Sequence, residues 1–171
     1  MTNSEREEKT QEILNTPNPY KTRGFELVSD EHRKHSDYDV KLPLRGTKDS
    51  AGYDFYSNDT VTIQSGDKFL FWSDIKSYMV RREVLELYVR SSIGIKKGLM
   101  LCNTVGIIDA DYFSNESNDG NIGICLRNIS NEPATIEQGE RIAQGIFKTF
   151  LESDNCNSEE ERKGGIGHSG K

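Results

Sequence analysis

Short apolar segments separated by turn-forming residues run along the chain from Arg23 onward. Glycine-containing turns stand between several of them, at residues 65–67, 118–120 and 137–140. We expect strands at residues 25–28, 52–55, 61–63, 69–72, 84–89, 99–102, 106–108, 122–126, 134–136 and 142–147. A spacing of about 8 to 12 residues between short strands is typical of an all-β sandwich, barrel or jelly roll. The pattern therefore predicts an all-β fold.

The segment 84–90 shows the alternation expected of a half-buried strand. Leu85, Leu87 and Val89 fall on one face, and the residues between them are polar or amphipathic. Since successive side chains of a strand point to opposite faces, this strand should bury one face and expose the other.

The two ends of the chain have a different pattern. In residues 1–22, Ser4 and Glu7 form a possible capping box, and a short helix could continue to residue 14 before two prolines. Residues 151–171 are acidic and then glycine-rich, which indicates either a disordered tail or a flexible flap whose backbone amides wrap an anion. We therefore divide the chain into an N-terminal extension (1–22), a β domain (23–150) and a C-terminal arm (151–171).

Composition narrows the function classes. Among 171 residues there are 22 Lys and Arg and 28 Asp and Glu, a net charge of −6, so stable nucleic-acid binding through bulk charge is not expected. Only 33% of residues are hydrophobic, which suggests that the chain shares buried surface with partner chains. No apolar run is long enough to cross a membrane and the start of the chain has no apolar leader, so we expect a cytoplasmic protein.

The spacing of the three cysteines and three histidines suggests neither a disulfide framework nor a metal site. Cys102, Cys125 and Cys156 form no CxxC pair, and we expect them to be reduced bystanders, with the first two as small core residues. His32 and His35 lie among charged residues and are expected to be solvated.

Five polar or glycine-rich segments could address a phosphate, a metal or a base. They span residues 50–55, 90–94, 103–112, 139–144 and 162–170. In the second segment an arginine and two hydroxyls could cradle an oxyanion. In the third, Asp109 and Asp111 would share one face in an extended chain, where a carboxylate could act as a general base or ligate Mg²⁺. Each segment by itself is also compatible with an ordinary turn, and no GxxxxGK[ST], GxSxG or HExxH sequence is present.

Taken in order, the segments SAGYDF, RSSIG, NTVGIIDADY, GERIAQGIF and RKGGIGHSG resemble the five motifs of the homotrimeric dUTPases, with loops of the phage or Gram-positive type. The resemblance covers residues 23 to 171. It implies a jelly-roll or distorted β-barrel fold with a flexible glycine-rich C-terminal lid, and a homotrimer with active sites at subunit interfaces. It also implies Mg²⁺ and hydrolysis of dUTP to dUMP and pyrophosphate, which keeps uracil out of DNA and supplies dUMP for thymidylate synthesis.

The resemblance implies roles for the residues that bind the nucleoside. Asp109 matches the general base that activates the attacking water. Tyr112 matches the aromatic residue under the deoxyribose, which leaves no room for a 2′-hydroxyl. Asn103, Gly106 and Ile108 match the hairpin that binds uracil.

The remaining matches concern the phosphates and the lid. The matching residues are Arg90, Ser91, Ser92 and Gln144 for phosphate binding, Asp54 for orienting hydrated Mg²⁺, Arg162 for the γ-phosphate, and Ser169 and Ile166 in the lid.

The sequence departs from the family pattern in three places. Ile166 replaces the usual phenylalanine that stacks on uracil, and Arg162 is one residue closer to the glycine pair than usual. After Tyr112 the sequence FSNESNDGNIG implies a polar insertion, and such loops in some relatives bind regulatory proteins. Two other functions stay open: a dCTP deaminase of the same fold, or a module that binds dUTP and regulates a protein partner.

Overall fold

The computed structural model describes residues 21–156, 162, 164 and 165 of the chain. Twelve strands and three short helices account for its regular structure in this part. The strands are β1 (Arg23–Leu27), β2 (Leu44–Arg45), β3 (Tyr53–Tyr56), β4 (Val61–Ile63), β5 (Lys68–Trp72), β6 (Ile75–Met79), β7 (Glu83–Val89), β8 (Leu99–Leu101), β9 (Gly106–Asp109), β10 (Gly123–Asn128), β11 (Ala134–Ile136) and β12 (Arg141–Thr149). The helices are the 3-10 turns η1 (Asp30–His32) and η2 (Ala110–Tyr112) and the α-helix α2 (Ser91–Lys97). The predicted all-β class is confirmed.

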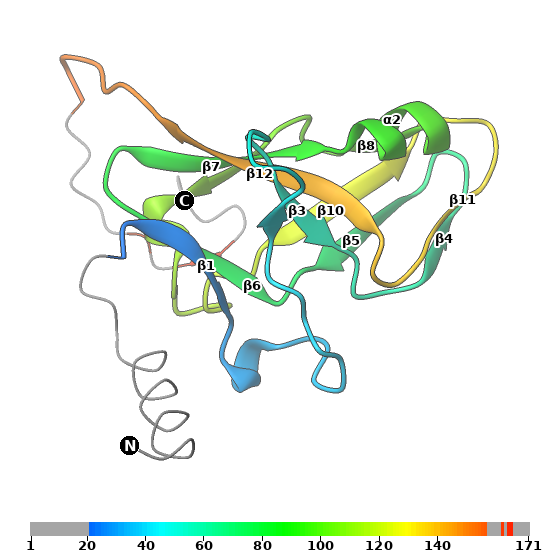
Figure 1. Ribbon diagram of the computed structural model, residues 1–171, viewed down its shortest axis with the longest axis horizontal. Coiled ribbons are helices and arrows are strands. Elements are labelled where there is room, and N and C mark those ends of the chain that lie inside the picture. The colour runs from blue at the N-terminus through cyan, green and yellow to red at the C-terminus, as the bar shows by residue number, and fades with distance from the viewer. Residues whose placement is uncertain (1–20, 157–161, 163, 166–171) are drawn as a thin grey trace.

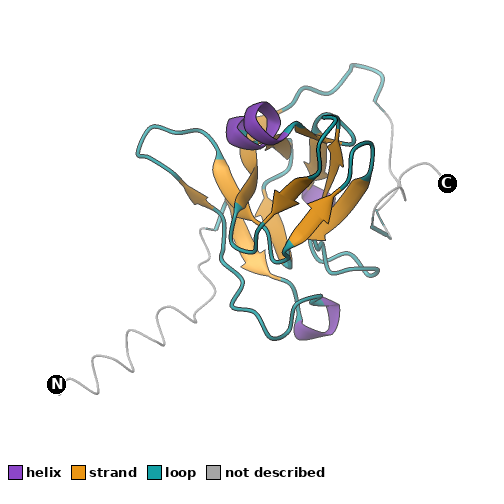
Figure 2. Cartoon of the chain, turned by 90° about the vertical axis from the view of Figure 1, so that its right-hand side faces the viewer, coloured by secondary structure: helices purple, strands orange, loops and turns teal. Residues whose placement is uncertain are grey.

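Antiparallel pairing arranges these strands in four sheets of a jelly-roll-like fold. The largest sheet has the order β2-β3-β12-β7-β9, and a second has the order β5-β10-β8. The other two sheets are the two-stranded pairs β1-β6 and β11-β4. The long strand β12 crosses the middle of the molecule between β3 and β7 (Figure 1). Figure 2 shows the strands gathered in one body, with α2 outside it.

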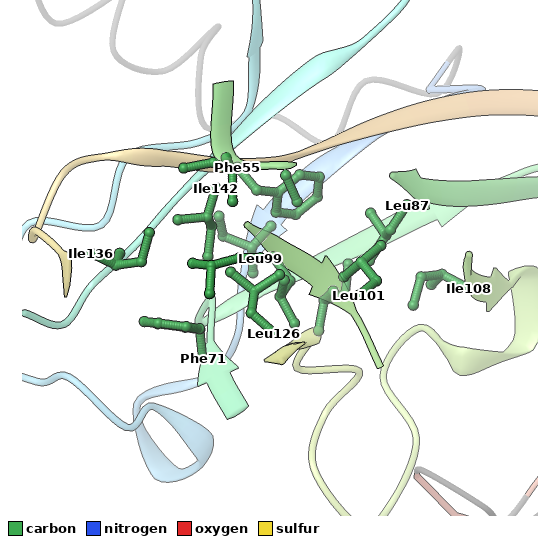
Figure 3. Close-up of a cluster of buried hydrophobic side chains, with 14 of the residues drawn as sticks. Phe55, Phe71, Leu87, Leu99, Leu101, Ile108, Leu126, Ile136 and Ile142 are labelled. Carbon is green, nitrogen blue, oxygen red and sulfur yellow. The ribbon is translucent and has the colours of Figure 1, made fainter. Parts of the chain in front are cut away.

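The core lies between the sheets and is built from the alternating apolar positions. Leu85 and Leu87 of β7 are fully buried, as the alternation predicted, while Glu86 between them is only half-buried. Side chains from the two larger sheets meet, with Phe55 and Leu87 facing Leu126 across the interior (Figure 3). Burying one such side chain contributes about 1.5–3 kcal/mol, so these contacts stabilise the sheet edges on which the polar loops stand.

Several elements were not predicted from the pattern. Strand β6 has the sequence IKSYM, and because two of its five residues are polar, the sequence shows no apolar alternation there. Helix α2 contains Gly94 and two isoleucines, which are poor helix formers, and it ends at Gly98 with the left-handed φ of 63°. A side chain at Gly98 would also approach Ser130 to 2.6 Å. Tertiary packing therefore overrides weak local propensity at this helix.

A buried carboxylate, Asp74, holds the segment 29–40 against the sheets. The backbone N–H groups of Lys34 and His35 donate to it at 2.9 and 2.8 Å, and Asn121 donates at 2.9 Å. The ring of His35 lies between Asp74 and Asp59, at 2.9 and 3.2 Å. The expectation that His35 is solvated is therefore wrong, because its partners come from distant loops.

Within the described ranges, no helix has the length and apolar character needed to cross a membrane.

We predict that Asp74→Asn destabilises the fold by about 1–3 kcal/mol at pH 7, because an amide turns a donor toward donors that are already buried. Burial alone would raise the pKa of Asp74, but the hydrogen bonds from Lys34, Asn121 and His35 outweigh it and lower the pKa. The stabilisation is therefore complete above the unfolded-state pKa of about 4, and it is lost as pH falls through the lower folded-state pKa. Urea unfolding from pH 7 to pH 3 should show the gap to wild type narrowing with acid.

The matched control is Asp67→Asn, since Asp67 is exposed in a turn. Its effect should stay within about 0.5 kcal/mol at every pH. If the loss in free energy of unfolding caused by Asp74→Asn stayed constant down to pH 3, the conclusion that Asp74 is ionised in this network would be wrong.

Candidate active site

A pocket of about 670 Å³ opens beside strand β9, a size suited to a small organic ligand. Its walls come from β9, from the hairpin before it and from the middle of β10. The lining residues are Leu70, Leu87, Leu101, Cys102, Asn103, Gly106, Ile107, Ile108, Asp109, Tyr112, Gly123, Cys125, Arg162 and Gly165. Six of the predicted site residues thus lie at one pocket: Asn103, Gly106, Ile108, Asp109, Tyr112 and Arg162.

Asp109 ends β9 at the edge of the five-stranded sheet, where its side chain is half exposed. The chain then turns into η2, so Asp111 does not continue the strand, and the segment forms the turn that the sequence had left open as an alternative. A common partner nevertheless joins the two carboxylates. Arg162 donates to Asp109 at 2.6 Å and to Asp111 at 2.8 Å.

Tyr112 is a rigid part of the pocket wall. Its side chain is buried, its hydroxyl donates to the carbonyl of Asn121 at 2.9 Å, and Asn118 donates to that hydroxyl at 2.8 Å. Burial raises the pKa of Tyr112, so the hydroxyl stays protonated as a donor. The guanidinium of Arg162 lies over the ring, 5.6 Å from its centre.

The hairpin between β8 and β9 presents backbone rather than large side chains. Thr104 has a left-handed φ of 61°, and the N–H of Val105 donates to the carbonyl of Asn103 at 2.7 Å. Gly106 packs on Leu87, whose Cβ would lie 3.0 Å from any Cβ placed at the glycine. This close approach explains the glycine, and it brings the main chain of the hairpin to the pocket.

Two cysteines belong to this pocket, and the expectation that they are core residues is wrong. Cys102 is exposed and Cys125 is half-buried. Their sulfur atoms lie 3.0 Å apart. The apolar runs around them misled the prediction, because Cys102 stands one position past the end of β8, where its side chain faces the pocket.

A second group of predicted residues gathers on the other part of the large sheet. Asp54 of β3 lies opposite Gln144 of β12, and the side chain of Asp54 is buried. Arg90 and Arg141 both donate to Asp54, the latter at 3.1 Å. A Cβ at Gly52 would meet the Gln144 side chain at 2.5 Å, so Gly52 makes room for it.

Ser91 and Ser92 are exposed at the start of α2, directly after Arg90. The N–H groups of the next two residues, Ile93 and Gly94, both donate to the carbonyl of Arg90 at 3.0 Å. Ser91 and Ser92 are therefore exposed at the first turn of α2, directly after Arg90 in the chain.

The two groups do not meet within the described part of one chain. Strands β12 and β7 separate Asp54 of β3 from β9. Arg90, just past the end of β7, comes six residues, or about 20 Å, after Val84, the residue opposite Asp109. None of the residues of the second group lines the pocket beside Asp109. One chain therefore holds the predicted site residues in two separate groups.

Asp54 is the residue that decides whether this part of the structure could accept a divalent cation. Over the residues that the structure describes, no group of three His, Cys, Asp or Glu side chains is arranged to hold a metal ion. Each oxygen of Asp54 accepts one arginine donor and keeps a second lone pair, which suits a hydrogen bond from metal-bound water. This donor set fits Mg²⁺, which keeps several waters and binds mostly to substrate phosphates.

The start of the glycine-rich arm lies on the pocket. Gly164 and Gly165 are buried, and a Cβ at Gly165 would meet Ser117 of the polar insertion at 2.8 Å. The insertion is ordered by Asn115, which donates to the carbonyl of Tyr112 at 2.9 Å. Ile166 and Ser169 lie outside the described residues.

Sequence reasoning missed two contributors. Arg141, the second partner of Asp54, stands in the GERIAQ segment, and its place at the start of β12 was the available signal. Ile107 lines the pocket and remains 55% exposed, so the strand β9 carries an apolar residue into the opening.

Known proteins of one family are similar to this chain over most of its length. A family model described as dUTPase matches residues 38–170. A deoxyuridine 5'-triphosphate nucleotidohydrolase of Lactococcus lactis is 43% identical over 152 residues, which cover 88% of this chain and 99% of that protein.

Solved structures of dUTPases are also similar to this chain. The crystal structure of a dUTPase from Streptococcus mutans matches with a TM-score of 0.67 and 39% identity, over 77% of this chain and 98% of that chain. A structure of the Staphylococcus bacteriophage 80alpha dUTPase with dUpNHpp matches with a TM-score of 0.60 and 26% identity, over 81% of this chain and 89% of that chain.

Proposed function

The chain belongs to the dUTPase family, and on that premise we propose that it hydrolyses dUTP to dUMP and pyrophosphate. The observation that carries the proposal is the pocket that joins a carboxylate, Asp109, to a buried aromatic wall, Tyr112, and an exposed backbone hairpin. Such a pocket can hold a nucleoside with its α-phosphate at the carboxylate. We place this activity in the cytoplasm.

Asp109 is the residue we assign as general base. Its carboxylate is half exposed at the pocket, so it can take a proton from the water that attacks the α-phosphorus. Without substrate, Arg162 neutralises this carboxylate. Substrate phosphates compete for the same guanidinium, so binding frees Asp109 and recruits Arg162 to the γ-phosphate.

The nucleoside half of the site selects by shape and by hydrogen bonding. The Tyr112 ring is held by two hydrogen bonds and cannot move aside for a 2′-hydroxyl. Main-chain groups of the hairpin at Asn103 and Gly106, closed by Ile108, pair with the uracil edge. A base with the wrong donors leaves buried polar groups unpaired, which costs more than a lost contact.

The phosphate half consists of Arg90, Ser91, Ser92 and Gln144. Arg90 offers a planar fork for phosphate oxygens, and Asp54 holds that fork in place. Asp54 would also orient hydrated Mg²⁺, which when bound would supply positive charge to offset that of the phosphate chain.

We further propose a homotrimer in which the two half-sites of different subunits combine. The positions along β7 support this, because Asp109 lies opposite Val84 while Arg90 follows the far end of that strand, six residues and about 20 Å further on. Exposed Ile107 and Leu44 stand on the two edge strands of the large sheet, and association would bury such apolar positions. Residues 151–171 form the arm in this proposal, with Ser169 gripping the phosphates and Ile166 covering the base.

The insertion after Tyr112 gives this enzyme an additional polar surface beside the pocket. Ser117 and Asn118 of this loop contact the arm at Gly165. A regulatory protein that docks on the insertion would therefore compete with closure of the arm.

The substrate prediction is tested by product release from separate reactions with dUTP, dCTP, dTTP and UTP, each with Mg²⁺ and again with chelator. Pyrophosphate should appear with dUTP alone and disappear on chelation, because the phosphate charge is then not offset. Ammonia from dCTP would identify a deaminase instead, and no product from any of the four would indicate a binding module.

The general base is tested by Asp109→Asn. We expect turnover to fall about 10²–10⁴-fold while dUTP binding, measured by calorimetry, persists. Asp111→Asn is the matched control, since Asp111 is also half exposed and also bound to Arg162. Equal losses in both variants would refute the assignment of Asp109.

The shared site is tested by mixing two inactive proteins. Asp109→Asn lacks the base, and Arg90→Lys keeps a charge for Asp54 but loses the fork for phosphate. After joint unfolding and refolding in equal amounts, each mixed trimer should contain one site that combines intact halves, which is about a quarter of all the sites formed. Recovery of dUTP hydrolysis in the mixture, and in neither protein refolded alone, is the expected result. No recovery in verified mixed trimers would place each site within one chain.

A further inference from the structure

Cys102 and Cys125 form a cross-strand pair at the pocket. The register of β8 and β10 sets Leu101 opposite Leu126, so the next two residues along, Cys102 and Cys125, also face each other. The N–H of Cys102 donates to the carbonyl of Cys125 at 2.9 Å. Directly opposed residues send their side chains to the same face, and the two sulfur atoms are 3.0 Å apart.

This placement meets the geometric requirement for a disulfide. Hydrogen-bonded opposed residues in an antiparallel ladder have Cα atoms about 5.5 Å apart. Disulfides form over Cα separations of about 4.4–6.8 Å. The two sulfur atoms still have to close from 3.0 Å to the bond length of about 2.05 Å, which draws Cys102 toward β10.

The bond would close the loop that carries one half-site. Asn103, Asp109 and Tyr112 all lie between the two cysteines in the sequence, with the polar insertion after them. Both sulfurs also stand in the wall of the pocket. A covalent tie at the base of this loop therefore acts directly on the nucleoside-binding surface.

The two thiols differ in reactivity. Cys102 is exposed and meets solutes first. Burial, and then the neighbouring Cys102, raise the pKa of the Cys125 thiol to about 11. Cys102 is therefore the thiol that is oxidised first, and Cys125 is the one that resolves the product.

We propose that Cys102 and Cys125 are a reversible oxidation site that forms a disulfide in the pocket wall and weakens nucleotide binding. The oxidant is hydrogen peroxide. The Cys102 thiolate attacks the peroxide oxygen, breaks the O–O bond and, with one proton, gives a sulfenic acid and water. The Cys125 sulfur then attacks the Cys102 sulfur, the hydroxyl leaves as a second water with the proton of Cys125, and the S–S bond forms. Two thiols are oxidised by two electrons, and a thiol reductant restores them.

The weakening follows from the position of Cys102 next to Asn103. The hairpin turns through Thr104 in a left-handed conformation, so it has little freedom to compensate when its first residue is drawn toward β10. We expect KM for dUTP to rise about fivefold or more, with a smaller change in kcat. This half of the proposal rests on the proposed function.

The test uses the full chain with Cys156→Ser as background, since Cys156 is an exposed third thiol outside the pocket. Treatment with hydrogen peroxide should remove both remaining thiols in a thiol titration. Peptide mapping should find residues 102 and 125 in one linked peptide pair, and dithiothreitol should reverse the change. Cys102→Ser in the same background should form no internal disulfide and should keep its KM after peroxide.

Three results would overturn the proposal. They are both thiols remaining free after peroxide, a linkage between chains in place of the internal one, and an internal disulfide that leaves KM and the calorimetric affinity for dUTP unchanged. Failure of the proposed function is a separate result. It would show as no dUTP hydrolysis by the reduced protein, while the thiol titration would still report on the disulfide.

Discussion

The register of strand β12 is the constraint on which the rest of the structure depends. It pairs with β7 at seven consecutive positions and with β3 on its other side. Gly145 lies in its middle, where a Cβ would approach the side chain of Leu85 to 2.8 Å. The same pairing sets Gln144 opposite Asp54 and passes the register through β7 to β9, where Asp109 stands. A slip of one residue would turn these side chains to the opposite face of the sheet.

The order of strands also decides what one chain can do alone. A spacing of about 4.8 Å between neighbouring strands keeps Asp54 of β3 away from the pocket at β9, and the length of β7 does the same for Arg90. In our proposal these two separated groups suit a symmetric assembly in which each copy supplies a different half of the site. A chain with only 33% hydrophobic residues gains buried surface from the same association. In our proposal the need for stability and the need for a complete site are met by one interface.

The loop between Cys102 and Cys125 concentrates the chemistry of the other half-site. It begins and ends at the paired strands β8 and β10, so its ends are fixed while the hairpin and the insertion extend from them. Arg162 of the arm reaches both Asp109 and Asp111 in this loop. Asp109, Asp111, Tyr112 and the thiol pair therefore lie on one segment whose two ends are paired with each other.

Much of this could be predicted from the sequence. The alternation in residues 84–90 predicted β7, and turn residues bounded most other strands, because both signals are local. The five motifs identified the family and the candidate residues, since those depend on order and spacing along the chain. The sequence did not predict the ring of His35 between two carboxylates, the turn that takes Asp111 out of the strand, or the meeting of Cys102 with Cys125. Those contacts join residues far apart in the chain or depend on how one turn is closed. Sequence alone thus determined which segments extend and which carry chemistry, whereas the tertiary structure decided which side chains meet, because strand register and loop path are set by long-range packing.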